Sequence, residues 1–185
     1  MSGFEKFLEI RRIYAHVMPK WMAEYKATGR QLHDPYLMNW EFSPIERDVW
    51  CDIRCAGLPF YPQMPVLNYF LDFGNPFLKI GIECDGKQWH NAERDAARDA
   101  RLSAEGWEIY RIPGHECRRS MDSEKLRADP GEHPNRHVWE RFFLDTSEGV
   151  IAAIGAQHFG VEIDEANAFL LGQTLVKHQT AQGYL

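Results

Sequence analysis

The sequence predicts an α/β domain built on a mixed sheet, with helical extensions at both ends. Its 185 residues, 44% of them hydrophobic, are enough for one domain with its own core. Apolar residues recur at helical spacing near the N-terminus, gather in three short stretches, return to helical spacing and then form a fourth stretch. This order of helix, three strands, helix and strand is typical of α/β or α+β proteins whose last strand joins the sheet in parallel.

The first two helices have clear sequence signals. Apolar side chains recur every three or four positions over residues 4–26, with Pro19 expected to kink or split this helix. Residues 43–46 read Ser-Pro-Ile-Glu, which places Ser at the N-cap, Pro at the first helical position and Glu three residues after the cap. We expect this second helix to reach about Cys55 and to end at Gly57.

Turn residues separate the stretches that we expect to be strands. Asn75-Pro76 is the expected turn between the second and third strands, and Asp85-Gly86 ends the third. The remaining expected elements, in order, are strands Phe60–Gln63, Val66–Phe73 and Phe77–Cys84, a helix over 91–105, a strand Trp107–Ile112, a loop over 120–136, and helices over 137–158 and 163–180.

Charge is distributed unevenly along the chain. The formal net charge is −6, and the three expected parts 1–42, 43–119 and 120–185 carry +1, −2 and −5. This balance argues against a basic protein that coats nucleic acid. We find no run approaching 18 apolar residues and no apolar leader segment, so we expect a cytoplasmic protein without a membrane partner. The acidic last third could be a solvated helical pair, a homodimer surface or a partner-binding element.

The four cysteines lack metal-binding spacing. No pair among Cys51, Cys55, Cys84 and Cys117 forms a Cys-x-x-Cys motif. Cys51 and Cys55 fall on one face of the second helix. We expect reduced and mostly buried thiols, and a zinc site that combines this pair with a distant histidine is the alternative.

Three acids interrupt otherwise apolar strands, and they indicate a functional site. Asp72, Glu83 and Asp85 lie at or near strand ends, where a buried carboxylate is costly unless it is paired or holds a cation. Glu83 and Asp85 are two residues apart and therefore face the same side. A hairpin would also bring Asp72 near Glu83. Such carboxylates repel one another unless a hard divalent cation such as Mg²⁺ or Mn²⁺ neutralises them. Lys87 and His90 add a cation and a titratable ring nearby.

An ordered set of motifs from Ser43 to about Arg111 resembles the PD-(D/E)XK nuclease superfamily. It is most similar to the branch that holds the very short patch repair endonuclease and small uncharacterised endonuclease-like proteins. The motifs are Ser43-Pro44-x-Glu46, Gln63 ahead of a strand, Asp72-Phe73, Ile82-Glu83-x-Asp85-Gly86-x-x-Trp89-His90, Asp95-x-x-Arg98-Asp99-x-x-Leu102 and Gly106-Trp107-x-Ile109-x-Arg111. The resemblance implies a restriction-endonuclease-like fold, with residues 43–119 as the nuclease core.

The resemblance also implies a role for each position. Asp72 and Glu83 would bind Mg²⁺ or Mn²⁺, with the Cys84 backbone carbonyl as a third ligand and Glu46 reaching the metal directly or through water. Metal-activated water would then attack a DNA phosphodiester in line. The remaining catalytic and DNA-contacting residues implied are Asp85, Lys87, His90, Gln63, Arg98 and Arg111.

The chain departs from the superfamily pattern in two places. Asp85 stands where the usual lysine does, so Lys87 or His90 would have to supply the missing charge or acid/base group. The residues around Trp89-His90 contain no thiol, so the structural zinc of the mismatch-repair members should be missing. Mismatch specificity therefore cannot be transferred to this chain.

Each of these residues also has a plain structural interpretation. Glu46 completes a helix cap, Asp72 and Asp85 suit turns, and Lys87 and His90 suit a solvated surface. The arginines and aspartates of the helix over 91–105 would pair on its surface. Three hypotheses follow: a metal-dependent DNA endonuclease, a nuclease-fold module that binds DNA or a protein without turnover, and a protein-interaction domain whose resemblance is accidental.

Overall fold

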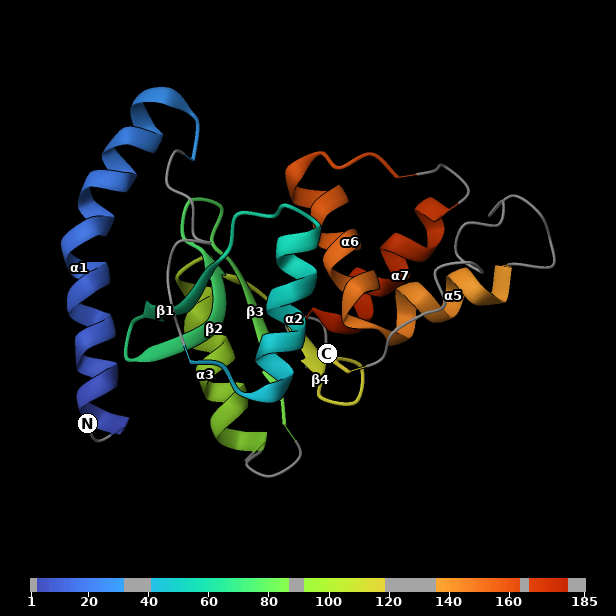
Figure 1. Cartoon of the computed structure of the whole chain (residues 1–185), viewed down its shortest axis with the longest axis horizontal. Coiled ribbons are helices and arrows are strands. Elements are labelled where there is room, and N and C mark those ends of the chain that lie inside the picture. Colours follow the sequence, from blue (N-terminus) through green and yellow to red (C-terminus); the bar gives the residue numbers. More distant parts are fainter. Residues whose placement is uncertain (1–2, 32–40, 87–91, 119–135, 164–166, 180–185) are drawn as a thin grey trace.

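A four-stranded mixed sheet forms the centre of the computed structural model, which describes residues 3–31, 41–86, 92–118, 136–163 and 167–179 (Figure 1). The strands lie in the order β1 (Tyr61–Val66), β2 (Tyr69–Asn75), β3 (Ile80–Asp85) and β4 (Glu108–Pro113). β1, β2 and β3 pair antiparallel, whereas β4 joins β3 in parallel. The prediction of an α/β fold with a parallel fourth strand is confirmed.

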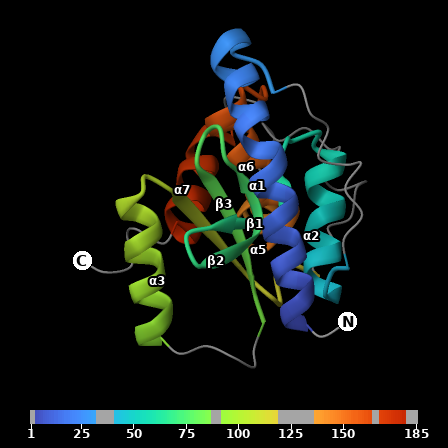
Figure 2. The ribbon, with the colours of Figure 1, turned by 90° about the vertical axis from the view of Figure 1, so that its left-hand side faces the viewer.

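Helices pack on both sides of this sheet. α2 (Pro44–Cys55) and α6 (Ser147–Phe159) share a core cluster with alternate residues of β3 and β4, among them Ile82 and Ile112. α1 (Gly3–Thr28) and α3 (Ala92–Ala104) share a second cluster with Leu71 and Ile109. Figure 2 shows α2 and α3 on opposite sides of the strands. α5 (Arg136–Asp145) and α7 (Ala168–His178) join α6 on the side of the sheet away from α1 (Figure 1).

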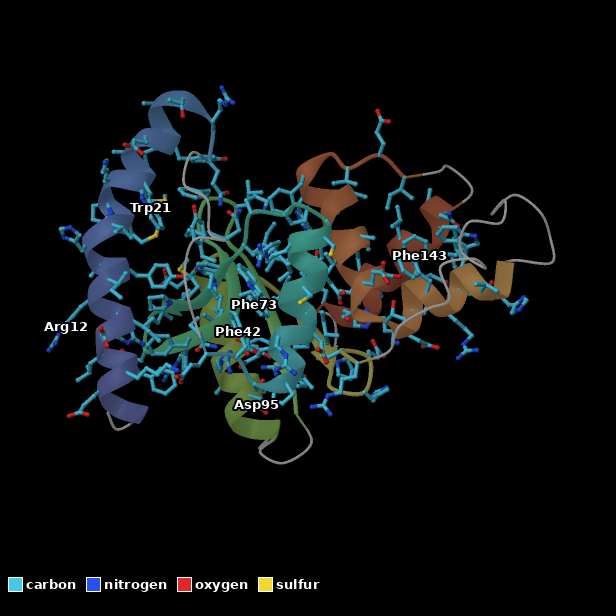
Figure 3. The ribbon with its side chains drawn as sticks, viewed as in Figure 1. Arg12, Trp21, Phe42, Phe73, Asp95 and Phe143 are labelled. Atoms are coloured by element: carbon cyan, nitrogen blue, oxygen red, sulfur yellow. The ribbon has the colours of Figure 1, made fainter. Side chains whose placement is uncertain are left out.

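The second helix begins as the sequence predicts. The Ser43 hydroxyl accepts the backbone N–H of Glu46 at 3.4 Å, and the Glu46 carboxylate accepts the N–H of Ser43 at 2.6 Å. The chain leaves the helix at Gly57, whose φ of 67° is the left-handed conformation that glycine adopts without strain. Inward-facing Trp50 stacks on Phe73 of β2, and Figure 3 shows Phe42 close to Phe73.

The boundaries of the first three strands differ from the prediction; β3 begins at Ile80 rather than at Phe77. β1 continues to Val66 and β2 begins at Tyr69, so the chain turns at Leu67 and Asn68 rather than before Val66. The predicted gap between Gln63 and Val66 contains Pro65, but β1 lies at the edge of the sheet and pairs only with β2. A proline is tolerated on an edge strand because one side of the strand needs no ladder partner.

α1 is one helix from Gly3 to Thr28, so of the two expected effects of Pro19, a kink or a split, the split is wrong. Contacts on either side of this proline hold the helix to β1. The Tyr14 hydroxyl donates to the Pro62 carbonyl at 2.6 Å, and the Trp21 ring stacks on Tyr61 at a centroid distance of 5.1 Å. Tertiary packing therefore outweighs the loss of one backbone donor.

The helix expected over 137–158 is two helices, which corrects that prediction. Thr146 has an extended backbone and its side chain caps α6 by accepting the N–H of Gly149 at 3.0 Å. The corner is tight, because a β-carbon on Gly149 would overlap the backbone of Phe142. The helix expected over 163–180 is shorter than predicted, and the loop expected over 120–136 falls almost wholly outside the described residues.

The C-terminal helices contribute to the main core rather than only covering it. Val150, Ile151 and Ile154 of α6 are at most 1% exposed and belong to the cluster that contains Ile82.

Among the described helices, none is long and apolar enough to cross a membrane. All four cysteines are free; Cys117 is buried, but Cys51 and Cys55 are exposed, so the expectation of mostly buried thiols is wrong for that pair. Both thiols lie on the outer face of α2.

Candidate active site

The strand acids meet where β2 and β3 stop pairing. Their backbone ladder runs from Asn75 opposite Ile80 to Phe73 opposite Ile82. The next residues beyond that last pair are Asp72 and Glu83. Asp72 takes over the bonding there, since its Oδ2 accepts the backbone N–H of Cys84 at 2.7 Å. The hairpin expected at Asn75-Pro76 therefore brings the two acids together.

Glu46 reaches the same place from the first turn of α2. Burial and the neighbouring Glu46 carboxyl group raise the pKa of Asp72 from 3.8 to about 7. A hydrogen bond between these two carboxyl groups contributes to the increase. Glu46 thus caps its helix, as the structural interpretation predicts, and also lies beside Asp72. Its role at a metal stays a prediction.

Glu83 is buried and ion-paired. It is 6% exposed, and its Oε1 accepts a hydrogen bond from Nη2 of Arg98 on α3. Burial and the nearby Asp72 carboxyl group raise the pKa of Glu83 well above its usual value, although Arg98 and Arg111 oppose this. Glu83 therefore lies on the face of the sheet that carries α3, opposite to Ile82, as the strand alternation predicts.

Arg111 binds two further acids beside Glu83. It stands opposite Glu83 in the parallel pairing of β3 with β4. Its Nη1 donates to Asp85 at 2.7 Å, while Nε and Nη2 donate to the two carboxylate oxygens of Asp99 at 3.1 and 3.0 Å. Such a two-bond fork fixes the geometry as well as the charge. Arg111 therefore holds Asp85 in place next to Glu83.

Asp99 was missed as a site residue because helix-surface pairing was expected for it. Asp99 is only 6% exposed, and Arg98 is half-buried, so neither pairs on the outer surface of α3 as expected. A signal was present in the sequence. Asp99 precedes the fully buried Leu102 by three residues, which places both on the inward face of the helix.

Of the remaining predicted site residues, Gln63 lies within the described part of the chain, and Lys87 and His90 do not. Gln63 lies in β1 between Pro62 and Met64, whose partners Phe73 and Leu71 flank Asp72, so it stands across the ladder from Asp72. Its φ of 48° is unusual for a residue other than glycine. Lys87 and His90 lie outside the described residues.

The donor atoms suit a hard cation, but their arrangement does not form a complete metal cage. Glu46, Asp72 and Glu83 offer carboxylate oxygens, the ligands that Mg²⁺ and Mn²⁺ prefer. In the described part of the chain, no group of three or more His, Cys, Asp or Glu side chains has the geometry of a metal site. One oxygen of Glu83 is instead occupied by Arg98. The chemistry of the donors fits a divalent cation, and binding one would require a local rearrangement.

Comparison with known proteins identifies the family. The restriction-endonuclease-like family model REase_MTES_1575 matches residues 45–128, which include every acid described above. A protein of Haemophilus influenzae described as uncharacterised is 34% identical over 126 residues, covering 66% of this chain and 88% of that protein. No solved structure gives a significant match. These matches exclude an accidental resemblance, and the chain belongs to the restriction-endonuclease-like, PD-(D/E)XK family.

Proposed function

We propose that the protein is a divalent-metal-dependent DNA endonuclease. One observation carries the proposal: carboxyl groups from three elements, Glu46 of α2, Asp72 of β2 and Glu83 of β3, gather where two central strands separate. Family membership supports a nuclease-type activity. Carboxyl groups held together at such a cost in burial and repulsion are typical of functional sites.

Asp72 and Glu83 would hold Mg²⁺ or Mn²⁺, with the Cys84 carbonyl and Glu46 as further ligands. When bound, the cation would lower the pKa of a water molecule and stabilise charge on the phosphate. The chain would contribute the rest. The Cys84 N–H fixes one oxygen of Asp72, and the Ser43 N–H fixes one oxygen of Glu46. The two carboxyl groups also share a hydrogen bond, which would have to open for both to bind the cation.

Some of the other residues implied by the resemblance are already engaged in ion pairs, which limits the role that each could take. Asp85 is bound to Arg111 and would orient that cation rather than act as the missing lysine. Arg111 has three of its N–H donors on carboxylates, so a DNA phosphate would have to compete with Asp99 for it. Arg98 and Gln63 remain predicted contacts to phosphate or water. Lys87 and His90 remain predicted for acid/base chemistry.

A module that binds DNA or a protein partner without cleaving it is the second candidate. The observation in its favour is Asp85, which brings a carboxylate to the position of the usual lysine. A homodimer or a recruiting partner would help such an acidic chain to approach DNA, because its surface repels phosphate.

Cleavage assays separate the two candidates. Supercoiled plasmid and end-labelled single-stranded DNA would be incubated at low salt with Mg²⁺, Mn²⁺ or EDTA. The proteins would be wild type, Asp72→Asn, Glu83→Gln and, as a matched control, Glu9→Gln, which changes an exposed carboxylate on α1. The proposal predicts metal-dependent cleavage by wild type and the control and none by the two site variants.

Three other results would count against it. Cleavage in EDTA, or by both site variants, would contradict the assigned residues. DNA retention in a gel-shift assay without cleavage in any metal would favour the binding module. No cleavage and no change in melting temperature with either cation would refute the metal site itself.

A further inference from the structure

Arg98 occupies the position from which a cation would neutralise Glu83. Its side chain is 21% exposed and that of Glu83 is 8% exposed, so water screens this ion pair poorly. The guanidinium also lies 5.7 Å from the centre of the Tyr69 ring and 3.5 Å from the Phe70 carbonyl oxygen. Arg98 thus contacts Glu83, the Tyr69 ring and the Phe70 carbonyl group beside the clustered carboxyl groups.

The bonding of Arg98 is nevertheless incomplete. Its Nε is buried and has no hydrogen-bond partner among the described residues. A buried N–H without a partner is uncommon and disfavours the arrangement that leaves it so. Arg111, by comparison, places its Nε, Nη1 and Nη2 on carboxylate oxygens. Of these two arginines, Arg98 has the weaker hold on its acids.

The two arginines divide the acids between them. Arg111 binds Asp85 and Asp99, whereas the Arg98 charge acts on Glu83 and on Asp72. A cation bound to Glu83 would compete with Arg98 for the negative charge of the same carboxylate, one oxygen of which Arg98 already holds. It would also repel the guanidinium, because two positive charges close together in a poorly screened site oppose each other.

We propose that Arg98 is the resident counter-cation of Glu83 in the metal-free protein and leaves Glu83 when a divalent cation binds there. This inference rests on the proposed function. It makes Arg98 a positioning residue that competes with the metal: it stabilises the empty site and weakens metal binding. Once released, its N–H donors become available to another acceptor at the same edge of the sheet.

Metal binding measured without substrate tests the competition. Mn²⁺ would be titrated into wild type, Arg98→Met, Arg98→Lys and Arg101→Met by calorimetry, and melting temperatures would be recorded in EDTA and in Mn²⁺. Arg101→Met is the matched control, because Arg101 is an exposed arginine three residues further along α3 that contacts Tyr69 but not Glu83.

We expect Arg98→Met to bind Mn²⁺ roughly tenfold more tightly than wild type, within the usual range for two coupled ligands. Its melting temperature should be lower than that of wild type in EDTA and should rise more on addition of Mn²⁺. Arg101→Met should bind Mn²⁺ like wild type. Arg98→Lys retains a charge without the planar fork, and its Mn²⁺ affinity should lie between those of wild type and Arg98→Met.

A readout on wild type keeps the test valid if Arg98→Met fails to fold. The NMR signal of the Arg98 Nε–H, assigned by its loss in Arg98→Lys, should shift on addition of Mg²⁺. An unshifted signal at saturating Mg²⁺, or equal Mn²⁺ affinity in Arg98→Met and wild type, would overturn the inference and leave the nuclease proposal standing. No metal binding by any of the proteins would overturn both.

Discussion

Replacing Asp72 with asparagine should stabilise the metal-free protein while it abolishes cleavage. Burial and the Glu46 carboxyl group raise the pKa of Asp72 from 3.8 to about 7, so the folded protein holds a proton that the unfolded chain has released over that range. The ionised form is therefore disfavoured in the folded state above pH 7. Asparagine has the same shape, can still accept the Cys84 N–H through its amide oxygen, and carries no charge to repel Glu46.

The magnitude follows from the shift. An increase from 3.8 to about 7 corresponds to a cost of about 4 kcal/mol when Asp72 is fully ionised. Asparagine recovers only part of this cost, because its amide must also be desolvated, and we expect a gain of roughly 2 kcal/mol at pH 8. The stability that wild type owes to the protonated group is complete below about pH 4 and is lost as the pH rises through 7.

Urea denaturation in EDTA at a series of pH values between 4 and 8 would measure this difference. The free energies of unfolding of wild type and Asp72→Asn should be similar at pH 4 and diverge with rising pH. Asp48→Asn is the control, since Asp48 is a half-buried acid in the same helix as Glu46. A variant less stable than wild type at pH 8, or a difference that does not change with pH, would refute the reasoning.

Three further predictions concern the surroundings of the site and the fold. Arg111→Met should lower the free energy of unfolding by about 3 kcal/mol in urea titrations, because it leaves the buried Asp99 without its partner. Gly149→Ala should cost about 2 kcal/mol or more by overlap with backbone, whereas Gly172→Ala, with open space around its β-carbon, should gain about 0.5–1 kcal/mol. Burial raises the pKa of Glu116, but hydrogen bonds with two basic side chains of α7 outweigh burial and lower this pKa below 4.5. The contribution of Glu116 to the stability of the fold is therefore present above pH 4.5 and is lost as the pH falls through the lowered pKa. Glu116→Gln should therefore cost roughly 2 kcal/mol at pH 7 and reduce the loss of stability that occurs as the pH falls below 4.5, as followed by circular dichroism. An unchanged acid transition in Glu116→Gln, equal effects of the two glycine variants, or a neutral Arg111→Met would each contradict its explanation.

The elements with local sequence signals were predicted well. The Ser43 cap, the Asn75-Pro76 turn and the alternation of Ile82 with Glu83 each depend on residues adjacent in the chain, and the structure bears them out. The errors arose where tertiary context decides. Pro65 is tolerated because β1 is an edge strand, and the corner at Thr146 depends on how closely Gly149 approaches the preceding helix.

The candidate site shows the same division between local and distant information. The sequence indicated that Asp72 and Glu83 would meet, because a hairpin and a period of two are enough to predict that. It could not indicate that Arg98 pairs with Glu83, or that Arg111 binds Asp85 and Asp99 together. Those contacts depend on how α3 is rotated against β3 and β4, which is decided by the packing of its buried face rather than by spacing along the chain.

Charge at the site suggests the order in which ligands would bind. Five carboxyl groups gather around two arginines, so the fully ionised site carries an excess of three negative charges in a chain whose net charge is already −6; the five are Glu46, Asp72, Glu83, Asp85 and Asp99. A phosphodiester approaching this site would be repelled, and neither arginine is available while it stays paired with its acids. One divalent cation would reduce the local excess to a single charge and release Arg98. The cation should therefore bind before DNA, and DNA affinity at low salt should increase with metal concentration instead of being an independent property of the surface.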